Sequence, residues 1–177
     1  MGKQYAALTE KDIDFIKDQK VFFIASSSGK EVNLSPKGYD SIRVLDASRL
    51  LYLDLPGSGN RTYRDAVAEG EFTLLFNAFE GSAKILRAFC KAEPIEKDDS
   101  RFKGYLIQFD EEERHVRQLF IFEIYAVESS CGDAVPYMKY EKERDSLRKW
   151  AKKMDKNGRL QNYIADHKEP PSLKDLN

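Results

Sequence analysis

The sequence is poor in the residues that bind metals and form covalent intermediates. Its 177 residues include 2 cysteines and 2 histidines, namely Cys90, Cys131, His115 and His167. No two of these form a CxxC, HxxxH or HExxH pair, so we expect no metal site. A GxSxG segment is also missing, which argues against a serine hydrolase triad. Two widely spaced thiols and an N-terminus without an apolar signal core favour a reducing, cytoplasmic setting.

Long apolar runs and an excess of one charge are missing too. No segment approaches the roughly 20 apolar residues that cross a bilayer, so we expect no membrane association. The formal net charge is -1, which provides no overall basic field to attract nucleic acid. With 33% charged and 41% hydrophobic residues, the composition predicts one globular domain with its own core.

The chain does contain a series of short β-rich segments. Apolar periodicity predicts six strands, at 21–26, 32–35, 49–55, 72–79, 84–95 and 117–129. The last segment is apolar on both faces, so we expect it to be buried on both sides. Strands at such short spacing, with few helices between them, favour an antiparallel barrel over a parallel sheet.

Helices are expected around the barrel. Thr9 and Asp12 form the pattern of a capping box for a short helix that ends near residue 19. Short helices are also expected within 62–69 and 98–109, and an amphipathic helix carries Leu147, Trp150 and Met154 at helical spacing. We expect one domain over 1–157 that includes the helix near 140–154, followed by a C-terminal helix and loose tail over 158–177.

The stretch DLPGSGNRTYRDA, residues 54–66, is the first candidate site. Two glycines permit a sharp turn, Asn60 or Thr62 can cap the following helix, and Arg61 brings a planar cation that suits phosphate oxygens. These parts could cradle a phosphate. The alternative is an ordinary turn into a helix, with an exposed arginine.

The second candidate is VNLSPKGYDSIRV, residues 32–44. Asn33, Ser35 and Lys37 alternate and therefore share one face of a strand, where they could bind a polar ligand. The alternative is an edge strand facing solvent, which Pro36 also fits. Arg87 lies within an apolar strand, either at an edge or as an inward partner for an anion.

These motifs, taken together and in order, resemble a known family. VNLSPKGYDSIRVLD, YLDLPGSGN, LLFNAFEG, ILRAF and SSCGDAVPYM followed by RDSLRKWA are similar to segments of flavin-binding split-barrel proteins of the pyridoxamine 5'-phosphate oxidase type. The narrower resemblance is to a bacterial branch whose members mostly have no assigned substrate. It spans roughly residues 12 to 155. It implies a six-stranded antiparallel split β-barrel with peripheral helices and a C-terminal helical segment.

The resemblance also implies a homodimer with two FMN molecules at its interface. By position, Asn33, Ser35 and Lys37 would face the cofactor, and Cys131 and Gly132 of the partner chain would contact the flavin ring. We include Arg87 as a further candidate partner for the cofactor. Those expected to surround the phosphate are Ser58, Asn60, Arg61 and Thr62.

The expected function is that of an FMN-binding flavoprotein, a flavin-dependent oxidoreductase acting on an unidentified small molecule. The alternative is a non-catalytic module that stores flavin or haem. A deazaflavin would need more cations near the phosphate than Arg61 and Arg64 supply, so FMN is favoured. Thr62 stands where the oxidase itself has a second basic residue. The arginine and histidine set that grips the oxidase's substrate has no counterpart near the C-terminus, so oxidation of pyridoxamine phosphate is not expected.

Overall fold

The computed structural model describes residues 2–29 and 31–170 of the chain. Its strands are β1 (Lys3–Tyr5), β2 (Phe22–Ser27), β3 (Val32–Lys37), β4 (Ile42–Asp46), β5 (Arg49–Asp54), β6 (Glu71–Asn77), β7 (Ile85–Ile95) and β8 (Gln118–Ser130). Its α-helices are α1 (Glu10–Asp18), α2 (Arg61–Val67), α3 (Phe102–Leu106), α4 (Ser146–Lys156) and α5 (Leu160–Asp166), and one 3-10 turn, η1 (Glu113–His115), precedes β8.

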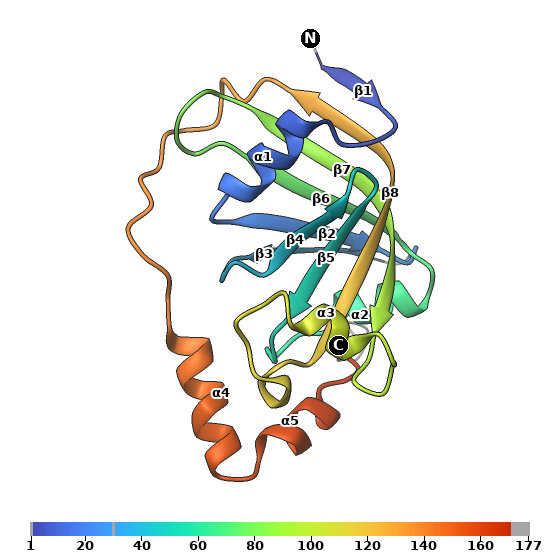
Figure 1. The fold of residues 1–177 in the computed structure, drawn as a ribbon, viewed down its shortest axis with the longest axis vertical. Coiled ribbons are helices and arrows are strands. Elements are labelled where there is room, and N and C mark those ends of the chain that lie inside the picture. Colours follow the sequence, from blue (N-terminus) through green and yellow to red (C-terminus); the bar gives the residue numbers. More distant parts are fainter. Residues whose placement is uncertain (1, 30, 171–177) are drawn as a thin grey trace, which may run out of the picture.

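The strands form one antiparallel sheet in the order β3-β2-β6-β7-β8-β5-β4, with β1 added on β8 (Figure 1). This confirms the expected split barrel and all six predicted strands. The described chain has two further strands that sequence reasoning missed. β1 has only three residues, and β4 follows β3 after a turn in which Tyr39 and Asp40 have positive φ angles of 62° and 53°. Neither feature leaves a strong periodic pattern.

The connection between β3 and β4 explains why the sheet curls. These strands lie at opposite ends of the hydrogen-bonded order, yet only residues 38–41 join them. A link of this length spans at most roughly 18 Å, so the two sheet edges must approach one another. The barrel therefore stays open between β3 and β4, and this opening creates the site described below.

Two apolar cores pack against opposite faces of β8. Phe120 and Phe122 belong to the core inside the barrel, whereas Leu119 and Ile121 pack into a second core beneath α3. Residues 118–122 of β8 are buried on both faces, which confirms the prediction for this part of the strand. Farther along, Tyr125 is 54% exposed, so the burial does not continue to the end of β8.

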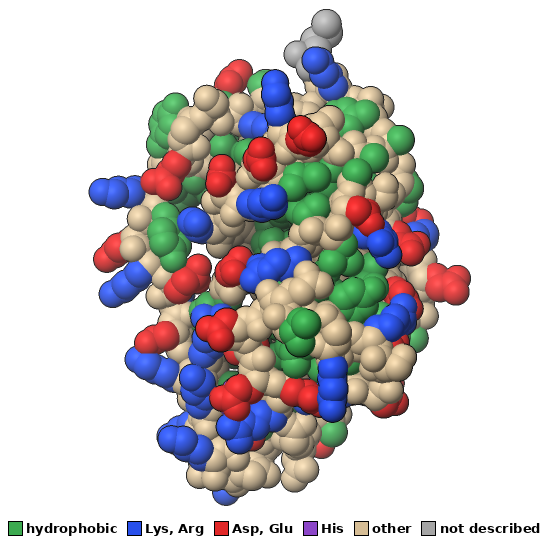
Figure 2. All heavy atoms as spheres, viewed as in Figure 1, with side chains coloured by type: hydrophobic (Ala, Val, Ile, Leu, Met, Phe, Trp, Pro, Cys, Tyr) green, Lys and Arg blue, Asp and Glu red, His purple; other side chains and the backbone are tan. Residues whose placement is uncertain are grey.

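The helices lie outside the barrel. In α1 the predicted capping box is present, because Thr9 and Asp12 each bond the other's backbone N–H. The helices α4 and α5 follow a long extended segment and lie together at one end of the molecule (Figure 1). Figure 2 shows charges of both signs over this face, with lysine and arginine gathered at the end that carries α4 and α5.

The proposed boundary after residue 157 falls between α4 and α5, next to Gly158, whose φ angle is 66°. The last part of the expected loose tail, 171–177, lies outside the described residues. Among the helices of the described ranges, none combines the length and apolar character that a membrane span requires.

Candidate functional site

A cavity of about 450 Å³, here called the site cavity, opens where the barrel is split. It brings together β3, the link 38–41, the end of β5 and the turn 57–62, which are separated in the sequence. The two candidate segments thus meet in one place. The predicted site residues that line this cavity are Asn33, Ser35, Lys37, Ser58, Asn60, Arg61 and Thr62.

One wall of the site cavity is β3. Its side chains alternate as expected: Asn33, Ser35 and Lys37 are half-buried, while Leu34 on the other face is 64% exposed. Among the described strands it pairs with β2 alone, so it is an edge strand that nevertheless turns its polar face inward. Ser35 Oγ is a buried polar atom with no hydrogen-bond partner in the described chain. Such atoms are rare in folded proteins and mark places where a ligand or water belongs.

Lys37 is the second polar group that this wall offers. Its ammonium lies 5.5 Å from the centre of the Tyr52 ring, and within the described ranges it donates no hydrogen bond to another protein group. Burial lowers the pKa of Lys37 from its ordinary value of 10.5, and the charge of Asp54 partly opposes this effect. A half-buried ammonium without a full complement of hydrogen bonds is well suited to bind an anion.

The floor of the site cavity is a buried carboxylate that sequence reasoning missed. Asp54, at the end of β5, is 3% exposed. It accepts hydrogen bonds from Tyr52 Oη at 3.0 Å, Arg117 Nε at 2.8 Å and Gln118 Nε2 at 3.0 Å. Burial, followed by the charge of Asp54, raises the pKa of Tyr52 well above its ordinary value, so its phenol remains a donor. Arg117 pairs with Asp54, and the charges of both groups act on Lys37, so two cations face one carboxylate at this point of the cavity.

The turn 57–62 differs from what the sequence predicted. Asn60 immediately precedes α2, but its side chain makes no capping hydrogen bond. It is 3% exposed and is held by other parts of the chain. Gly57 and Gly59 do not have positive φ angles, and a Cβ at either position would meet open space. These two glycines therefore leave open space beside the cavity, and neither is required for a left-handed backbone conformation.

The guanidinium groups beside the turn are already paired. Arg61 and Arg64 both donate to the carboxylate of Glu31, and Arg64 also donates to Asp65 at 2.8 Å and 2.9 Å. Hydrogen bonds from Arg64, together with the charges of both arginines, lower the pKa of Glu31. Arg61, expected as a cation for the phosphate, is thus part of an ion cluster at the cavity rim with Glu31, a carboxylate that the sequence did not indicate there.

Asp65 joins α2 to the β2–β3 hairpin. It is fully buried and accepts hydrogen bonds from Ser26 Oγ at 2.7 Å and Ser28 Oγ at 2.8 Å. Ser26 in turn accepts a bond of 3.1 Å from Asn33 Nδ2, and the same amide lies 3.4 Å from Thr62 Oγ1. This network fixes the β3 wall relative to the turn.

Three predicted residues lie outside the site cavity of this chain. Arg87 is on the central strand β7, where it pairs with Glu128 at 3.2 Å and donates to Ser130 Oγ at 3.2 Å. It is therefore neither at a sheet edge nor directed into the barrel. Cys131 is exposed, and Gly132 packs so closely on the backbone of Lys84 that a Cβ there would be 3.0 Å from Lys84 N.

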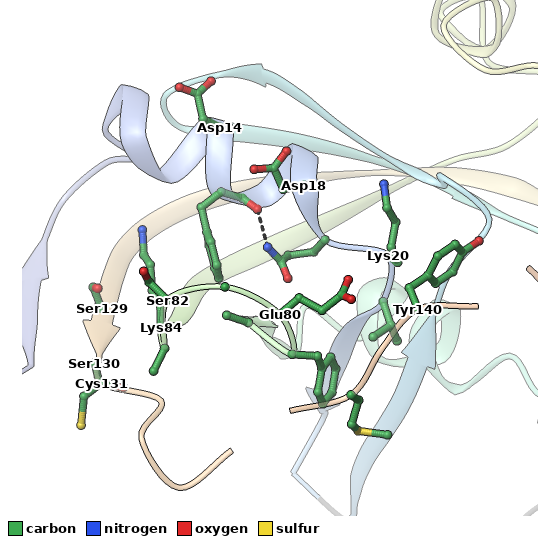
Figure 3. Close-up of a pocket in the computed structure, with 18 of the residues that line it drawn as sticks. Asp14, Asp18, Lys20, Glu80, Ser82, Lys84, Ser129, Ser130, Cys131 and Tyr140 are labelled. Atoms are coloured by element: carbon green, nitrogen blue, oxygen red, sulfur yellow. Dashed lines mark hydrogen bonds between the residues drawn. The ribbon is translucent and has the colours of Figure 1, made fainter. Parts of the chain in front are cut away.

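Cys131 instead lines a larger groove of about 1420 Å³ between α1, the 78–84 loop and the extended segment after β8. In Figure 3, Cys131 lies at the opposite end of this groove from Lys20 and Tyr140. The groove is lined by side chains of both charges, among them Lys20, Lys84, Asp18 and Glu80.

Neither histidine, both of which lie in the described part of the chain, lines the site cavity. His115 is 5% exposed, and its Nε2 lies 3.4 Å from Asp155. His167 stacks on Tyr163, with 3.9 Å between ring centres. In the same described part, no group of three or more histidine, cysteine, aspartate or glutamate side chains is arranged to hold a metal ion.

Comparison with known proteins identifies relatives of this fold. No family model matches the chain. The "Pyridoxamine 5'-phosphate oxidase family protein ustO" of Aspergillus flavus is 33% identical over 139 residues, which cover 76% of this chain and 56% of that protein. The chain thus spans about half the length of the curated relative that it matches.

Two solved structures share the fold. A candidate pyridoxamine 5'-phosphate oxidase of Lactobacillus delbrueckii has a TM-score of 0.55 and 24% identity, and the match covers 68% of this chain and 93% of that one. A protein from Mycobacterium smegmatis described as FAD-binding has a TM-score of 0.51 and 8% identity, with coverage of 71% and 97%. At these identities, the structures show a common fold.

Proposed function

We propose that this chain, a pyridoxamine 5'-phosphate oxidase-like split-barrel protein by sequence and fold, is an FMN-binding flavoprotein. The observation that carries the proposal is the site cavity, which joins the polar face of β3 to the turn 57–62 and contains a buried hydroxyl, Ser35 Oγ, without a partner. The FAD-binding description of the mycobacterial neighbour adds support for a flavin on this fold.

The cavity fits a cofactor of this kind. Its volume of about 450 Å³ lies within the roughly 300–1,000 Å³ of ordinary ligand pockets. Lys37 would bind an anionic or electron-rich part of the ligand, and Ser35 would supply a hydroxyl. Ser58 and Thr62 would contribute hydroxyls near the phosphate, with Arg61 at the rim. A bound flavin supplies the capacity to accept and pass on hydride or electrons, and the chain binds and orients it.

FMN suits the site cavity better than the alternatives. A deazaflavin with a longer anionic tail would need additional cations, but Arg61 and Arg64 already share the carboxylate of Glu31. Haem would need an axial ligand, which histidine often provides, and both histidines of the chain lie outside the cavity. The storage alternative therefore applies to flavin more than to haem.

The proposal includes a homodimer in a cytoplasmic setting. Val32 and Leu34 on the edge strand β3 are 76% and 64% exposed, and exposed apolar side chains on a strand edge favour association. In such a dimer, Cys131 and Gly132 of the partner subunit would approach the flavin ring. Sedimentation of the purified protein tests this, and a monomer at all concentrations would contradict it.

FMN titration of the purified apoprotein tests the central proposal. We expect the absorbance and fluorescence of FMN to change on binding. Lys37→Met should weaken the affinity about 10- to 100-fold, because it removes an interaction with a charged group. The matched control is Lys153→Met, since Lys153 is exposed on α4 and does not line the cavity. A wild-type protein that leaves FMN unchanged would refute the proposal.

A second assay separates an oxidoreductase from a flavin store. The FMN-loaded protein is supplied with NADH or NADPH and an artificial electron acceptor, and loss of the reduced nicotinamide is followed by absorbance. Turnover above that of free FMN supports an oxidoreductase. Tight FMN binding without turnover would favour the storage module.

A further inference from the structure

Asn60 uses both ends of its carboxamide within the protein. Its Nδ2 donates to the backbone carbonyl of Lys168 at 2.7 Å, and its Oδ1 accepts from Gln118 Nε2 at 2.8 Å. The side chain is 3% exposed although it borders the site cavity. Its hydrogen bonds thus connect three segments that are far apart in the sequence.

On one side of Asn60 lies the buried floor of the cavity. Gln118 donates to Asp54 as well as to Asn60, and Arg117 pairs with Asp54 through Nε. The same guanidinium donates through Nη1 to the carbonyl of Gly57 at 3.3 Å. Hydrogen bonds from Arg117 and Gln118 therefore hold the turn at Gly57 and at Asn60.

On the other side lies the segment after α5. Lys168 Nζ pairs with Glu96 at 2.9 Å and lies 5.2 Å from the centre of the Tyr63 ring. Tyr63 also donates to Glu96. These contacts fix Lys168 beside α2, so that its carbonyl is available to Asn60.

We propose that Asn60 is a positioning residue, which fastens the segment after α5 to the turn 57–60 and thereby sets the shape of the end of the cavity that receives the ligand's phosphate. This inference rests on the proposed function for its phosphate. It assigns a binding role to a C-terminal segment that sequence reasoning treated as a separate, loose part. It also reassigns Asn60 from a phosphate contact to a support for that contact.

The test compares FMN with riboflavin, which has the same ring and lacks the phosphate. Asn60→Ala should weaken FMN binding by up to about tenfold, the effect of losing one or two hydrogen bonds, and should leave riboflavin binding unchanged. Asn157→Ala is the matched control, because Asn157 is exposed at the end of α4. Equal losses for FMN and riboflavin, or no loss for either, would overturn the inference.

Hydrogen exchange provides a readout that does not depend on flavin. The amides of residues 57–62 should exchange faster in Asn60→Ala than in the wild type. Lys168→Ala, which leaves the cavity lining intact, should have the same effect to a lesser degree. If the wild type binds no flavin, the proposed function fails, and the exchange comparison still decides whether Asn60 fastens the turn. Unchanged exchange in both variants would refute the fastening itself.

Discussion

The two sides of the site cavity, β3 and the turn 57–62, differ in whether their polar groups already have hydrogen-bond or ionic partners within the protein. On β3, Ser35 Oγ has no partner in the described chain, and Lys37 lies against an aromatic ring. Across the cavity, Asn60 is bonded at both ends and Arg61 is paired with Glu31. Because unsatisfied buried groups cost free energy, a ligand gains most at β3. The turn side contributes mainly a shape that is fixed in advance.

The largest expected effect tests the structural role of the turn side. Asp65→Asn should lower the free energy of unfolding by about 2 kcal/mol, because Asp65 is fully buried and its charge accepts hydrogen bonds from the half-buried Arg64. It also disturbs the bonds from Ser26 and Ser28. Denaturant unfolding followed by circular dichroism measures this change.

Asp98→Asn is the matched control for that experiment. Asp98 is exposed, and such a change typically alters stability by no more than about 0.5 kcal/mol. If Asp65→Asn changes the free energy of unfolding as little as Asp98→Asn does, the polar network does not hold the turn in place. The proposed difference between the turn and β3 would then be wrong.

The next effect concerns the pH dependence of FMN binding. Burial lowers the pKa of Lys37 below its ordinary value of 10.5, and an anionic or electron-rich part of a bound ligand would favour its charged form. The complex then holds more protons than the free protein, so affinity is highest below the lowered pKa and falls as the pH rises through it. Titrations between about pH 7 and 10 should show a decline of up to about tenfold.

Lys37→Arg sharpens this prediction, since an arginine stays charged over the whole range. Its affinity for FMN should follow a flatter pH profile than that of the wild type. The same decline in both proteins would assign the titration to another group and would weaken the role given to β3.

A smaller effect is expected at Ser35. Ser35→Ala removes a buried hydroxyl without a partner, so the free energy of unfolding of the apoprotein should stay the same or rise by up to about 1 kcal/mol. FMN affinity should fall a few-fold. Ser100→Ala, at an exposed position, serves as the control. A clear loss of stability in Ser35→Ala would mean that the hydroxyl is already satisfied.

The sequence predicted those parts of the fold and site that depend on local periodicity. Alternation placed Asn33, Ser35 and Lys37 on one face, and the structure turns that face toward the cavity. The capping box at Thr9 is likewise a local pattern. The meeting of β3 with the turn 57–62 was expected from the family resemblance, which describes a complete arrangement rather than a single segment.

Contacts between distant segments could not be predicted in this way. Arg117 and Asp54 are 63 positions apart, and Asn60 meets the carbonyl of Lys168 over 108 positions. A lone aspartate at the end of an apolar strand is the signal that could have identified Asp54, since a buried carboxylate requires donors. No pattern in the sequence indicated that Glu31 would pair with both Arg61 and Arg64.

The smallest predicted effect concerns the pairing of Glu31 with Arg61 and Arg64. It is a gain in FMN affinity, whereas the variants above lose affinity or stability. Glu31 accepts from Arg61 and Arg64 at the rim of the site cavity, where it competes with a phosphate for both guanidinium groups. Glu31→Gln should therefore tighten FMN binding by about two- to threefold at low salt, an amount typical of partly exposed charges. The gain should shrink as added salt screens these charges. Glu69→Gln, at an exposed position beyond α2, is the control. Weaker binding in Glu31→Gln would mean that Glu31 orients the two arginines for the ligand. The turn would then contribute as directly to ligand binding as β3 does.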